Sequence, residues 1–574
     1  MKYLACITPL FVMAARRERR FSALVAFQRI EEAMENDTVD IDSQISDEEE
    51  RLSDMEEEEL QPNLVEESEE SDESEEEATL PRIEDRIHEY RSPDGELWTT
   101  KAPRRGQTPA RNLIRHRPGP TPYASARVHD EESSFLQIFD KKMIDTLVFE
   151  TNREGRAVRG EDFLRTNYEE MKAYIGLCIL RSVYKGHLES IDELFDEEHG
   201  RSIFRKTMTL TRFKELRRFL RFDNRATRAS RLQRDKLAAV RLLLDGLTHS
   251  QQCYLLGETI TIDEQLYSFR GRCRFIQYIP SKPAKYGLKF WCLNDSTSAY
   301  CWNIVMYTGK DETREECPLG EHVVLKLTEP LRAPGIGITT DNFFCSLSLS
   351  RKLLERNMTL LGTMRPNRRE VPLEIRSHRG TRLHTSQFLY TRDNIQIVAY
   401  KAKKTKMVIV LSSEHCAPTL SNADNRKPSA IIDYNHRKGG TDRMDQMIAS
   451  YTTKYKSRRW HVPVFCNILD IACLNAFVLH KELFPQVNQH KSNRRRLFLL
   501  SLGFALVRHQ QESRIRAQEL PASQVPRVQT SVKGRCFSCS RSADKKTRST
   551  CSSCGRFICS LHSNLVCLSC LSGQ

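Results

Sequence analysis

The chain has 574 residues, of which 39% are hydrophobic and 29% are charged. This balance is too polar for an integral membrane protein and too apolar for a chain that is disordered throughout. At roughly 150 residues per domain, the length predicts three or four structural units. Because no run reaches the roughly 18 uninterrupted apolar residues of a spanning helix, we expect no membrane partner.

The net charge of +13 conceals two oppositely charged parts. The segment 30–77 holds 24 acidic residues and one basic residue, which leaves 52 acids and 88 bases, or +36, on the rest of the chain. A body this basic predicts a polyanionic partner, most often nucleic acid. Residues 1–80 are predicted as a disordered acidic region, because they offer little apolar surface to bury. Residues 81–127, rich in Arg and Pro, are predicted as a basic linker.

The cysteines indicate a reducing compartment and one metal-binding module. Of the 18 cysteines, seven lie between Cys536 and Cys570, and the others are scattered without a repeating spacing. The apolar stretch Tyr3–Ala15 imitates a signal peptide, but four arginines follow it and make a poor cleavage context. We interpret this stretch as a short buried or partner-facing helix, or as a leader without a structural role. The expected location is the nucleus.

Two regions show the period of amphipathic helices. In SSFLQIFDKKMIDTLVF, apolar residues recur every three or four positions after a serine that we expect to cap the helix. The blocks NYEEMKAYIGLCILRSVYKG and TLTRFKELRRFLRFDN continue this period, so 128–257 is predicted to be helical. The block VPVFCNILDIACLNAFVLHKELF predicts a second helical region within 452–530. Three cysteines on apolar helical faces are expected in the core: Cys178, Cys466 and Cys473.

From about residue 258 the hydrophobic period changes to two, as in strands. GETITIDEQLYSFRG alternates β-branched and polar residues, and KYGLKFWCLND, AYCWNIVMYTG and GIGITTDNFF follow as further strands. A helical run, SLSLSRKLLERN, then precedes another strand, MTLLGTM. Strands interrupted by a helix predict a mixed α/β sheet. More strand patterns occur at 368–428, and a helix is expected after HRKGG.

Aspartates lie at the ends of several of these elements. Asp263 lies in an otherwise apolar strand, and Asp341 ends the run GIGITTD. Asp442 and Asp445 are three positions apart on a predicted helix, which places them on one face. If these carboxylates converge, they suit Mg²⁺, and two ions about 4 Å apart can promote in-line displacement at phosphorus. The competing interpretation is local, because such an aspartate is usually a turn or cap residue, and Asp442 could cap its own helix.

Longer blocks make the metal-site interpretation more specific. TIDEQLYSFRGRCRFIQYIPSKPAKYGLK, TTDNFFCS, LLGTMRPNRRE, YNHRKGGTDRMDQM and SRRWHVPVFCNILDIACLNAF closely resemble, in the same order, blocks of piggyBac-family transposases. The resemblance covers roughly residues 128–500 and ends in a matching Cys/His module. It implies an α/β fold with an RNase H-like catalytic core at 258–367 and 429–451, interrupted by an inserted β-rich domain at 368–428. The helical regions at 128–257 and 452–530 would then serve dimerisation and DNA binding.

The resemblance also implies a site and a reaction. By motif position, the three catalytic aspartates of the family fall on Asp263, Asp341 and Asp442, which would hold two Mg²⁺ ions. Asp445 matches a fourth aspartate at that site, and Trp460 matches a tryptophan near it. The implied reaction is cut-and-paste transposition of double-stranded DNA at TTAA targets by a homodimer. Water nicks the element end, the new 3′-OH forms a hairpin, and the hairpin is resolved and joined to target DNA.

A basic stretch interleaved with aromatic residues follows Asp263. Such a mixture can hold backbone phosphates and stack on splayed bases. The alternative is a strand hairpin with cations extended along its surface. The aromatic residues are Tyr267, Phe269, Phe275, Tyr278 and Tyr286. The predicted DNA-binding residues are Arg270, Arg272, Arg274, Lys282, Lys285, Lys289 and, from the resemblance, Trp460.

The C-terminal segment 535–572 predicts two structural Zn²⁺ ions. Eight soft ligands in four closely spaced pairs suit two tetrahedral sites with no position left for substrate. We favour an interleaved pairing, in which the first and third pairs share one ion, over a sequential pairing. The resemblance implies that this module binds element-end DNA, whereas the spacing equally allows a RING-like or histone-tail-reading module. The eight ligands are Cys536, Cys539, Cys551, Cys554, Cys559, His562, Cys567 and Cys570.

These observations favour a nuclear, Mg²⁺-dependent DNA transposase of the piggyBac type. The main alternative is a domesticated, transposase-derived DNA-binding or chromatin protein without transposition activity. A ubiquitin ligase built on the zinc module would leave most of the chain unexplained.

Overall fold

The computed structural model describes residues 88–103, 117–186, 189–280, 282–309, 317–332, 334–377, 380–519, 529–550, 556–559 and 562. The chain divides into two compact units, Met1–Arg508 and His509–Gln574. The predicted acidic region at 1–80 and the apolar stretch Tyr3–Ala15 lie outside the described residues.

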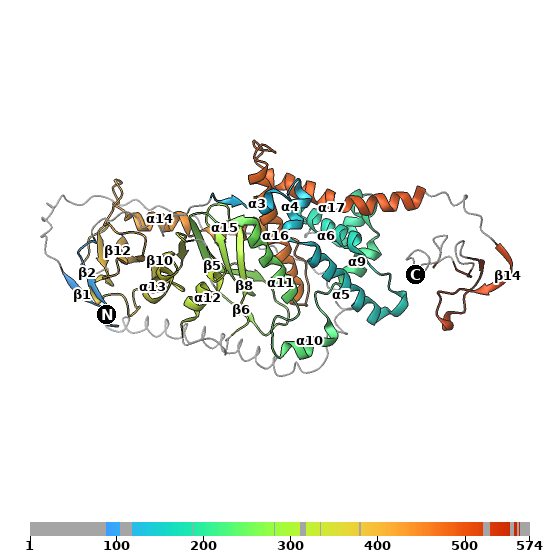
Figure 1. The fold of residues 1–574 in the computed structure, drawn as a ribbon, viewed down its shortest axis with the longest axis horizontal. Coiled ribbons are helices and arrows are strands. Elements are labelled where there is room, and N and C mark those ends of the chain that lie inside the picture. Colours follow the sequence, from blue (N-terminus) through green and yellow to red (C-terminus); the bar gives the residue numbers. More distant parts are fainter. Residues whose placement is uncertain are drawn as a thin grey trace, which may run out of the picture. The chain divides into compact units, whose positions relative to one another are not determined.

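A mixed sheet of 11 strands organises the first unit, which confirms the predicted mixed α/β class (Figure 1). Its order is β1-β2-β11-β12-β13-β10-β9-β5-β7-β6, and β8 also pairs with β7. The β5–β9 and β9–β10 pairs are parallel, and the other pairs are antiparallel. The strands are β1 (Glu89–Arg91), β2 (Leu97–Thr99), β5 (Thr259–Ser268), β6 (Ile276–Tyr278), β7 (Tyr286–Asp295), β8 (Cys301–Met306), β9 (Gly337–Thr340), β10 (Thr359–Met364), β11 (Ser386–Tyr390), β12 (Gln396–Lys403) and β13 (Lys406–Ser412).

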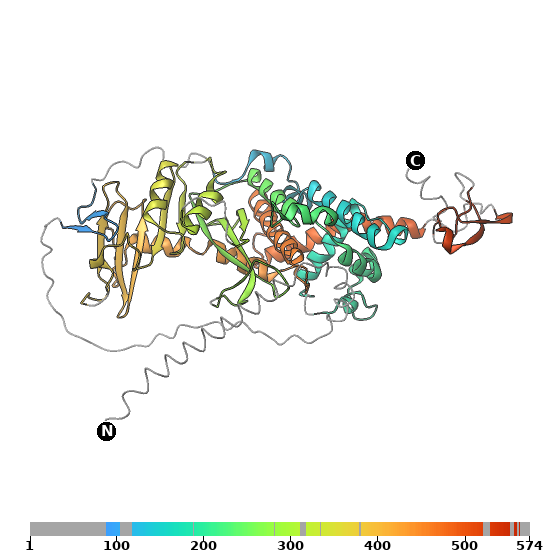
Figure 2. The same ribbon diagram turned by 90° about the horizontal axis from the view of Figure 1, so that it is seen from below.

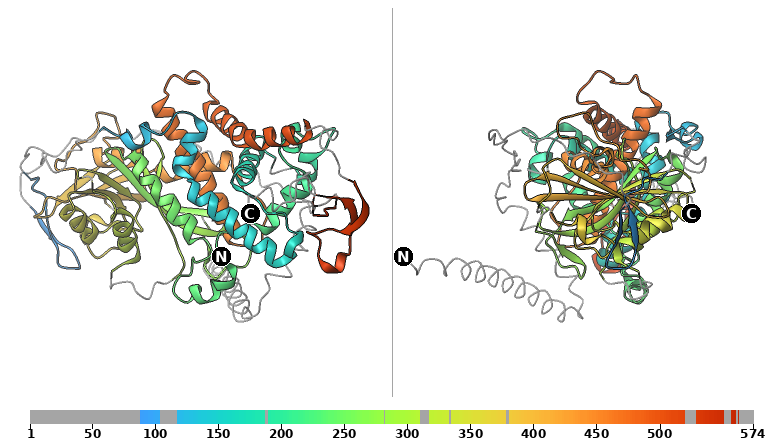
Figure 3. Two further views of the ribbon diagram at one scale, coloured as in Figure 1. Left: turned by 45° about the vertical axis from the view of Figure 1, so that its right-hand side comes forward. Right: turned by 90° about the vertical axis from the view of Figure 1, so that its left-hand side faces the viewer.

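Apolar and polar residues alternate along the central strand β5, so the strand has an apolar face and a polar face, and both faces are buried. Ile260 and Ile262 are fully buried on one face, and Thr261 and Gln265 are buried on the other. The strands fan out about the sheet axis in the right-hand view of Figure 3, as expected of a twisted sheet. Four helices accompany these strands: α12 (Leu319–Thr328), α13 (Leu347–Glu355), α14 (Ser429–Arg437) and α15 (Gly440–Ser450).

The strands within 368–428, predicted as an inserted domain, belong to the same sheet as the predicted core. β13 pairs with β10 over four residues, from Leu361↔Ser412 to Met364↔Ile409. β12 and β11 then extend the sheet outward, with β1 and β2 beyond them (Figure 2). The composition of this segment predicted its strands, but their attachment depends on long-range hydrogen bonds that local patterns do not encode.

A hairpin, β1–β2, lies within the segment predicted as the basic linker at 81–127. Trp98 on β2 is completely buried, and its indole Nε1 donates to the Glu370 carbonyl at 3.1 Å. Glu96, beside it, pairs with Arg351 at 2.8 Å. One buried indole therefore fixes a segment whose overall composition is typical of a linker.

Trp98→Ala is expected to detach this hairpin. Removing a fully buried indole should cost about 3–5 kcal/mol, because lost apolar burial adds to the cavity left behind. Urea unfolding of the full chain measures this cost, and hydrogen exchange shows whether β1 and β2 lose protection first. Glu96→Gln is the matched control in the same hairpin; it removes a partly exposed ion pair and should cost less than about 1 kcal/mol. Equal effects of the two changes would contradict the anchoring role.

The helical region begins with two helices where the sequence predicted one. The break falls at Phe139, and Asp140 caps the second helix through Met143 N at 2.8 Å. Asp130, rather than a serine, caps the first helix, and Ser133 completes a capping box with it. The helices of this region are α3 (Pro122–Ser125), α4 (Glu131–Ile138), α5 (Lys141–Arg159), α6 (Tyr168–Val183), α7 (Ile191–Phe195), α8 (Ser202–Thr207), α9 (Leu210–Phe219), α10 (Arg225–Leu232) and α11 (Arg241–Thr248). A small sheet, β3 (Gly119–Pro120) with β4 (Tyr254–Leu255), joins its two ends.

Helix α16 (His461–Leu483) runs through the centre of this region, beside α4 and α11. It is long and apolar enough to cross a membrane, but the qualifying stretch is entirely buried inside the fold, so it is a core helix. Cys466 and Cys473 on α16 are buried, as is Cys178 on α6, where the sequence predicted them. Helix α17 (Arg494–Glu519) follows α16.

Candidate active site and metal centre

Asp263 and Asp341 lie at adjacent positions on two neighbouring parallel strands. β5 pairs with β9 from Thr259↔Gly337 to Ile262↔Thr340, so the next residues of the two strands are these aspartates. The register therefore places both carboxylates at the carboxyl end of β9. Each carboxylate accepts a local backbone bond, Asp263 from Glu264 N at 2.7 Å and Asp341 from Phe343 N at 2.9 Å.

Helix α15 brings its aspartates to the same face of β5. Its start lies so close to the strand that a Cβ on Gly440 would come within 2.6 Å of the Thr261 hydroxyl oxygen, so glycine is required there. Thr441 donates to Asn294 on β7 at 3.0 Å. Asp442 is exposed in the first turn and makes no cap bond, which excludes the capping interpretation. The structure thus brings the four aspartates toward one another from three separate chain segments.

Three of these carboxyls have raised pKa values, chiefly because they are buried. The pKa of Asp263 is raised to about 7, chiefly by burial and also by the charges of Asp341 and Asp442, against the lowering effects of the Glu264 N–H and Lys282. Burial likewise raises the pKa of Asp341, with a contribution from Glu264. Burial also raises the pKa of Asp445 to about 6. Such crowding of carboxylates stores repulsion that a bound cation relieves.

In the metal-free chain, raising the pH should reduce stability through Asp263. Folding raises the pKa of this carboxyl from 3.8 to about 7, so the folded state holds the proton more tightly than the unfolded state. Its stabilising contribution is complete below the unfolded pKa and is lost as the pH rises through 7, at about 1.4 kcal/mol per pKa unit. In EDTA, the melting temperature of Asp263→Asn minus that of the parent should increase as the pH rises from about 5 to about 8. A difference that stays constant over this range would contradict the assignment.

Oxygen-only donors on neighbouring elements are the ligand set that Mg²⁺ prefers. The residues present therefore fit a magnesium centre held by Asp263, Asp341 and Asp442. Among the described residues, however, the only group of three or more possible ligand atoms that all lie within 4.8 Å of one another is in the C-terminal unit. The aspartates thus interact electrostatically without being packed as tightly as that group.

Three residues at this site were not singled out from the sequence. Gln265 donates to Asp445 at 2.7 Å and to Asn467 on α16 at 3.2 Å. Glu264 pairs with Lys289 at 2.6 Å. The period of β5 could have revealed Gln265, because it lies two residues after Asp263 on the same face. An amide inside the apolar run of α16 was the corresponding signal for Asn467.

The predicted DNA-binding cations have different surroundings. Arg270, Arg272, Arg274 and Lys285 are exposed, as a phosphate-binding role requires. Lys282 is half-buried, donates to the Glu264 carbonyl at 3.3 Å and acts on the carboxylates of the site. Lys289 is also half-buried; Glu264 matches its charge, and its ammonium lies 3.9 Å from the centroid of the Trp291 ring. These contacts place Lys282 and Lys289 among the groups that shape the carboxylate site.

The aromatic residues of this stretch are mostly core residues. Tyr267, Phe269 and Phe275 are buried, so they do not offer faces to bases. Tyr278 is 53% exposed and lies 4.7 Å from Tyr286 between ring centroids. Trp460 is half-buried and packs edge-on against Phe275 at 5.0 Å. Most of these aromatic side chains therefore pack inside the fold and do not form a surface on which bases could stack.

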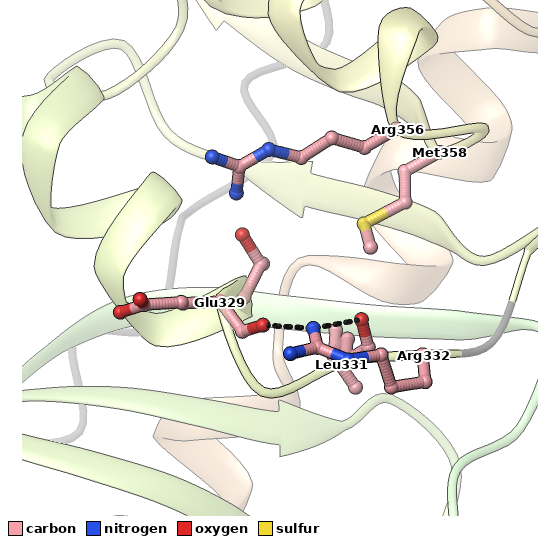
Figure 4. Close-up of a pocket in the computed structure, with 6 residues that line it drawn as sticks. Glu329, Leu331, Arg332, Arg356 and Met358 are labelled. Carbon is pink, nitrogen blue, oxygen red and sulfur yellow. Dashed lines mark hydrogen bonds between the residues drawn. The ribbon is translucent and has the colours of Figure 1, made fainter.

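The first unit also contains a cavity of about 280 Å³, whose lining residues are drawn in Figure 4. Its lining includes Leu331 and Arg332, which precede β9, and Met358, which precedes β10. The cavity is thus at the amino ends of the two parallel strands, whereas Asp341 follows the carboxyl end of β9. Arg332 in its wall is bonded to its own segment, through the Glu329 carbonyl at 2.6 Å. This cavity takes no part in the candidate site.

The second unit contains a cluster of three cysteines and one histidine whose ligand atoms all lie within 4.8 Å of one another. Strands β14 (Gln529–Arg535) and β15 (Lys546–Ser549) form an antiparallel pair in this unit, and Cys536 follows β14 directly. Cys539 Sγ lies 3.6 Å from Cys559 Sγ and 3.4 Å from His562 Nδ1. Four ligands at zinc bond lengths of about 2.3 Å would be about 3.8 Å apart, so the cluster fits one tetrahedral zinc ion.

The grouping of this cluster corresponds to the interleaved pairing, since the first and third ligand pairs come together. Burial alone would raise the pKa of Cys536, but backbone N–H donors of Cys559 and Ser538 lower it to about 6. A thiolate is the form that binds zinc. The other four predicted ligands lie outside the described residues: Cys551, Cys554, Cys567 and Cys570.

Comparisons with known proteins identify the family of this chain. The family model "Transposase IS4" matches residues 130–477. Human piggyBac transposable element-derived protein 3 is 28% identical over 264 residues, which are 43% of this chain and 44% of that protein. Human piggyBac transposable element-derived protein 2 is 25% identical over 373 residues, 60% of this chain and 61% of that protein. The chain thus matches less than two thirds of the length of either relative.

A solved structure extends the similarity to most of the chain. A piggyBac transposase in a synaptic complex with hairpin DNA, determined by cryo-EM, superimposes with a TM-score of 0.66 at 31% identity. The match covers 79% of this chain and 100% of that one. The chain belongs to the piggyBac family of DDE transposases and transposase-derived proteins.

Proposed function

We propose that this protein is a Mg²⁺-dependent DNA transposase that nicks, hairpins and joins DNA strands at TTAA targets. One observation carries the proposal. Asp263 and Asp341 lie side by side on the parallel strands β5 and β9, and helix α15, which bears Asp442 and Asp445, packs against β5. A set of carboxylates collected from three segments, in which burial raises the pKa of Asp263, Asp341 and Asp445, is typical of a catalytic metal site.

The residues of the site divide into two roles. Asp263, Asp341 and Asp442 would hold two Mg²⁺ ions, which, when bound, activate the attacking oxygen and stabilise the leaving oxygen at phosphorus. Asp445 is held by Gln265 and completes the acidic site from α15. Lys282 lies close enough to lower the pKa of Asp263 and Asp445, and it would meet the phosphate as the DNA enters.

An RNase H-like core is the fold that we propose for this site. The strands β8, β7, β5, β9 and β10 lie in the spatial order 3-2-1-4-5 when numbered along the chain. The first three are antiparallel and the last two continue in parallel from β5. This order supports the proposal because it places the ends of the first and fourth strands, with their aspartates, side by side.

Further partners follow from the same proposal. The solved relative is a synaptic complex with hairpin DNA. We propose that this chain also binds element ends as a homodimer in the nucleus, with Arg270, Arg272, Arg274 and Lys285 contacting phosphates near the site. The C-terminal zinc module would bind the ends of the element. DNA affinity should fall steeply with salt, since each phosphate contact releases counterions.

The alternative is a transposase-derived protein that binds DNA without cutting it. The two human relatives carry the description "transposable element-derived", which favours this alternative. The complete set of aspartates favours an active enzyme.

Incubation with Mg²⁺ and DNA that carries a candidate element end next to TTAA distinguishes the two. Nicks and hairpins formed by the parent and absent with Asp263→Ala support the enzyme. Tight binding without cleavage in Mg²⁺ or Mn²⁺ supports the non-enzymatic alternative.

A further inference from the structure

Gln265 occupies a position that the chemistry of the site does not explain. It lies on β5 two residues after Asp263, on the same face, and its side chain is completely buried. A buried amide requires partners for both its N–H donors and its oxygen, since unpaired groups cost about 1–3 kcal/mol each. The identity of these partners indicates what the residue does.

Gln265 and Asn467 form a reciprocal amide pair. Asn467 Nδ2 donates to Gln265 Oε1 at 2.8 Å, and Gln265 Nε2 donates to Asn467 Oδ1 at 3.2 Å. Asn467 lies on α16 and is also completely buried. The pair bonds the central strand to the central helix and fixes the plane of the Gln265 amide.

The remaining N–H of Gln265 points to the acidic site. Gln265 Nε2 donates to Asp445 Oδ1 at 2.7 Å, a short bond of the kind that ionised acceptors make. One oxygen of Asp445 is thereby occupied, which leaves the other oxygen for a cation. Asp445 is bonded to both β5 and α16 through a single rigid amide pair.

The face of α16 that bears Asn467 supports the segment after α15 in the same way. Asp470, one turn later, accepts from Thr452 Oγ1 at 2.7 Å and from Thr453 N at 2.8 Å. Tyr267, two residues after Gln265 on β5, donates to Asp470 at 3.4 Å. Polar contacts from β5 and α16 therefore hold both helix α15 and the segment that follows it.

We propose that Gln265 and Asn467 are positioning residues that orient Asp445 for binding a divalent cation at this site. This inference rests on the proposed function, since it concerns the same carboxylate site. The amide pair fixes which oxygen of Asp445 is free and holds α15 at a set distance from β5, so that Asp442 stays near Asp263. Without these amides, Asp445 stays on helix α15, but its carboxylate is free to rotate.

Mn²⁺ binding to the full chain tests this, measured by electron paramagnetic resonance of the free ion. Gln265→Met and Asn467→Leu keep the side-chain volume but lose the amide bonds, and each should weaken Mn²⁺ affinity about tenfold, equivalent to about 1.4 kcal/mol. The double variant Gln265→Asn with Asn467→Gln exchanges the two amides and preserves their summed length. It should restore affinity to within about threefold of the parent.

Asn475→Leu is the matched control. Asn475 is a completely buried asparagine about two turns further along α16, and it exchanges two bonds with the Cys301 backbone at 2.9 and 2.8 Å. Its loss should reduce the melting temperature as much as Asn467→Leu does while leaving Mn²⁺ affinity unchanged. A parent that binds Mn²⁺ and variants that bind it equally well overturn the positioning role alone. A parent that binds no Mn²⁺ overturns the proposed function and this inference with it.

Discussion

Asp263→Asn, Asp341→Asn and Asp442→Asn are each expected to reduce Mg²⁺-dependent strand cleavage by about 1,000-fold or more. An amide keeps the size and the hydrogen bonds of the side chain but removes the negative charge that holds the cation. A factor of 1,000 corresponds to about 4 kcal/mol of transition-state stabilisation, within the several kcal/mol that a metal ion supplies at phosphorus. Cleavage of end-labelled DNA under single-turnover conditions measures the loss.

Asp445→Asn should have a smaller effect on cleavage, of about tenfold, because one of its oxygens is already bonded to Gln265. Asp245→Asn, at an exposed position on α11, is the control for surface charge and should leave cleavage unchanged. DNA binding in EDTA should be retained by all of these variants, since other residues are proposed to contact the phosphates. Substantial cleavage by Asp341→Asn would contradict the assignment of this residue to the metal centre.

The four aspartates of the candidate site could be named from the sequence. Local patterns placed Asp341 after a short apolar strand and Asp442 and Asp445 on one face of a helix, but they left a turn or cap role open, and only the resemblance of the longer blocks singled these positions out. What the sequence could not supply was the strand register. Only the pairing of Ile262 with Thr340 shows that Asp263 and Asp341 are adjacent.

The structure also shows distant partners that the sequence did not predict. Lys289 is typical of a phosphate-binding cation by composition, but Glu264 and the Trp291 ring surround it in the fold. Trp98 lies in a segment with the composition of a linker, and its burial depends on the Glu370 backbone far along the chain. Electrostatic and packing partners separated by many residues leave no trace in a local pattern.

Removing zinc is expected to unfold the C-terminal module and leave the first unit folded. A module this small has little core, and zinc binding contributes about 10–16 kcal/mol of its folding free energy. Cys559→Ser removes a ligand from the observed cluster, so it should release one of the two zinc ions that the sequence predicts for each chain. Metal analysis gives the stoichiometry, and limited proteolysis reports the loss of the module.

The matched control is Cys416→Ser, because Cys416 is an exposed cysteine of the first unit and should retain the full zinc content. The melting transition of the first unit should be the same for the parent, Cys559→Ser and the chelated protein, since its core holds no ligand of the cluster. If the module binds element ends, Cys559→Ser should lose affinity for those ends while strand cleavage of short, non-specific DNA persists. A parent chain that contains no zinc would contradict the metal assignment, and the three cysteines and the histidine would then need another explanation for lying within 4.8 Å of one another.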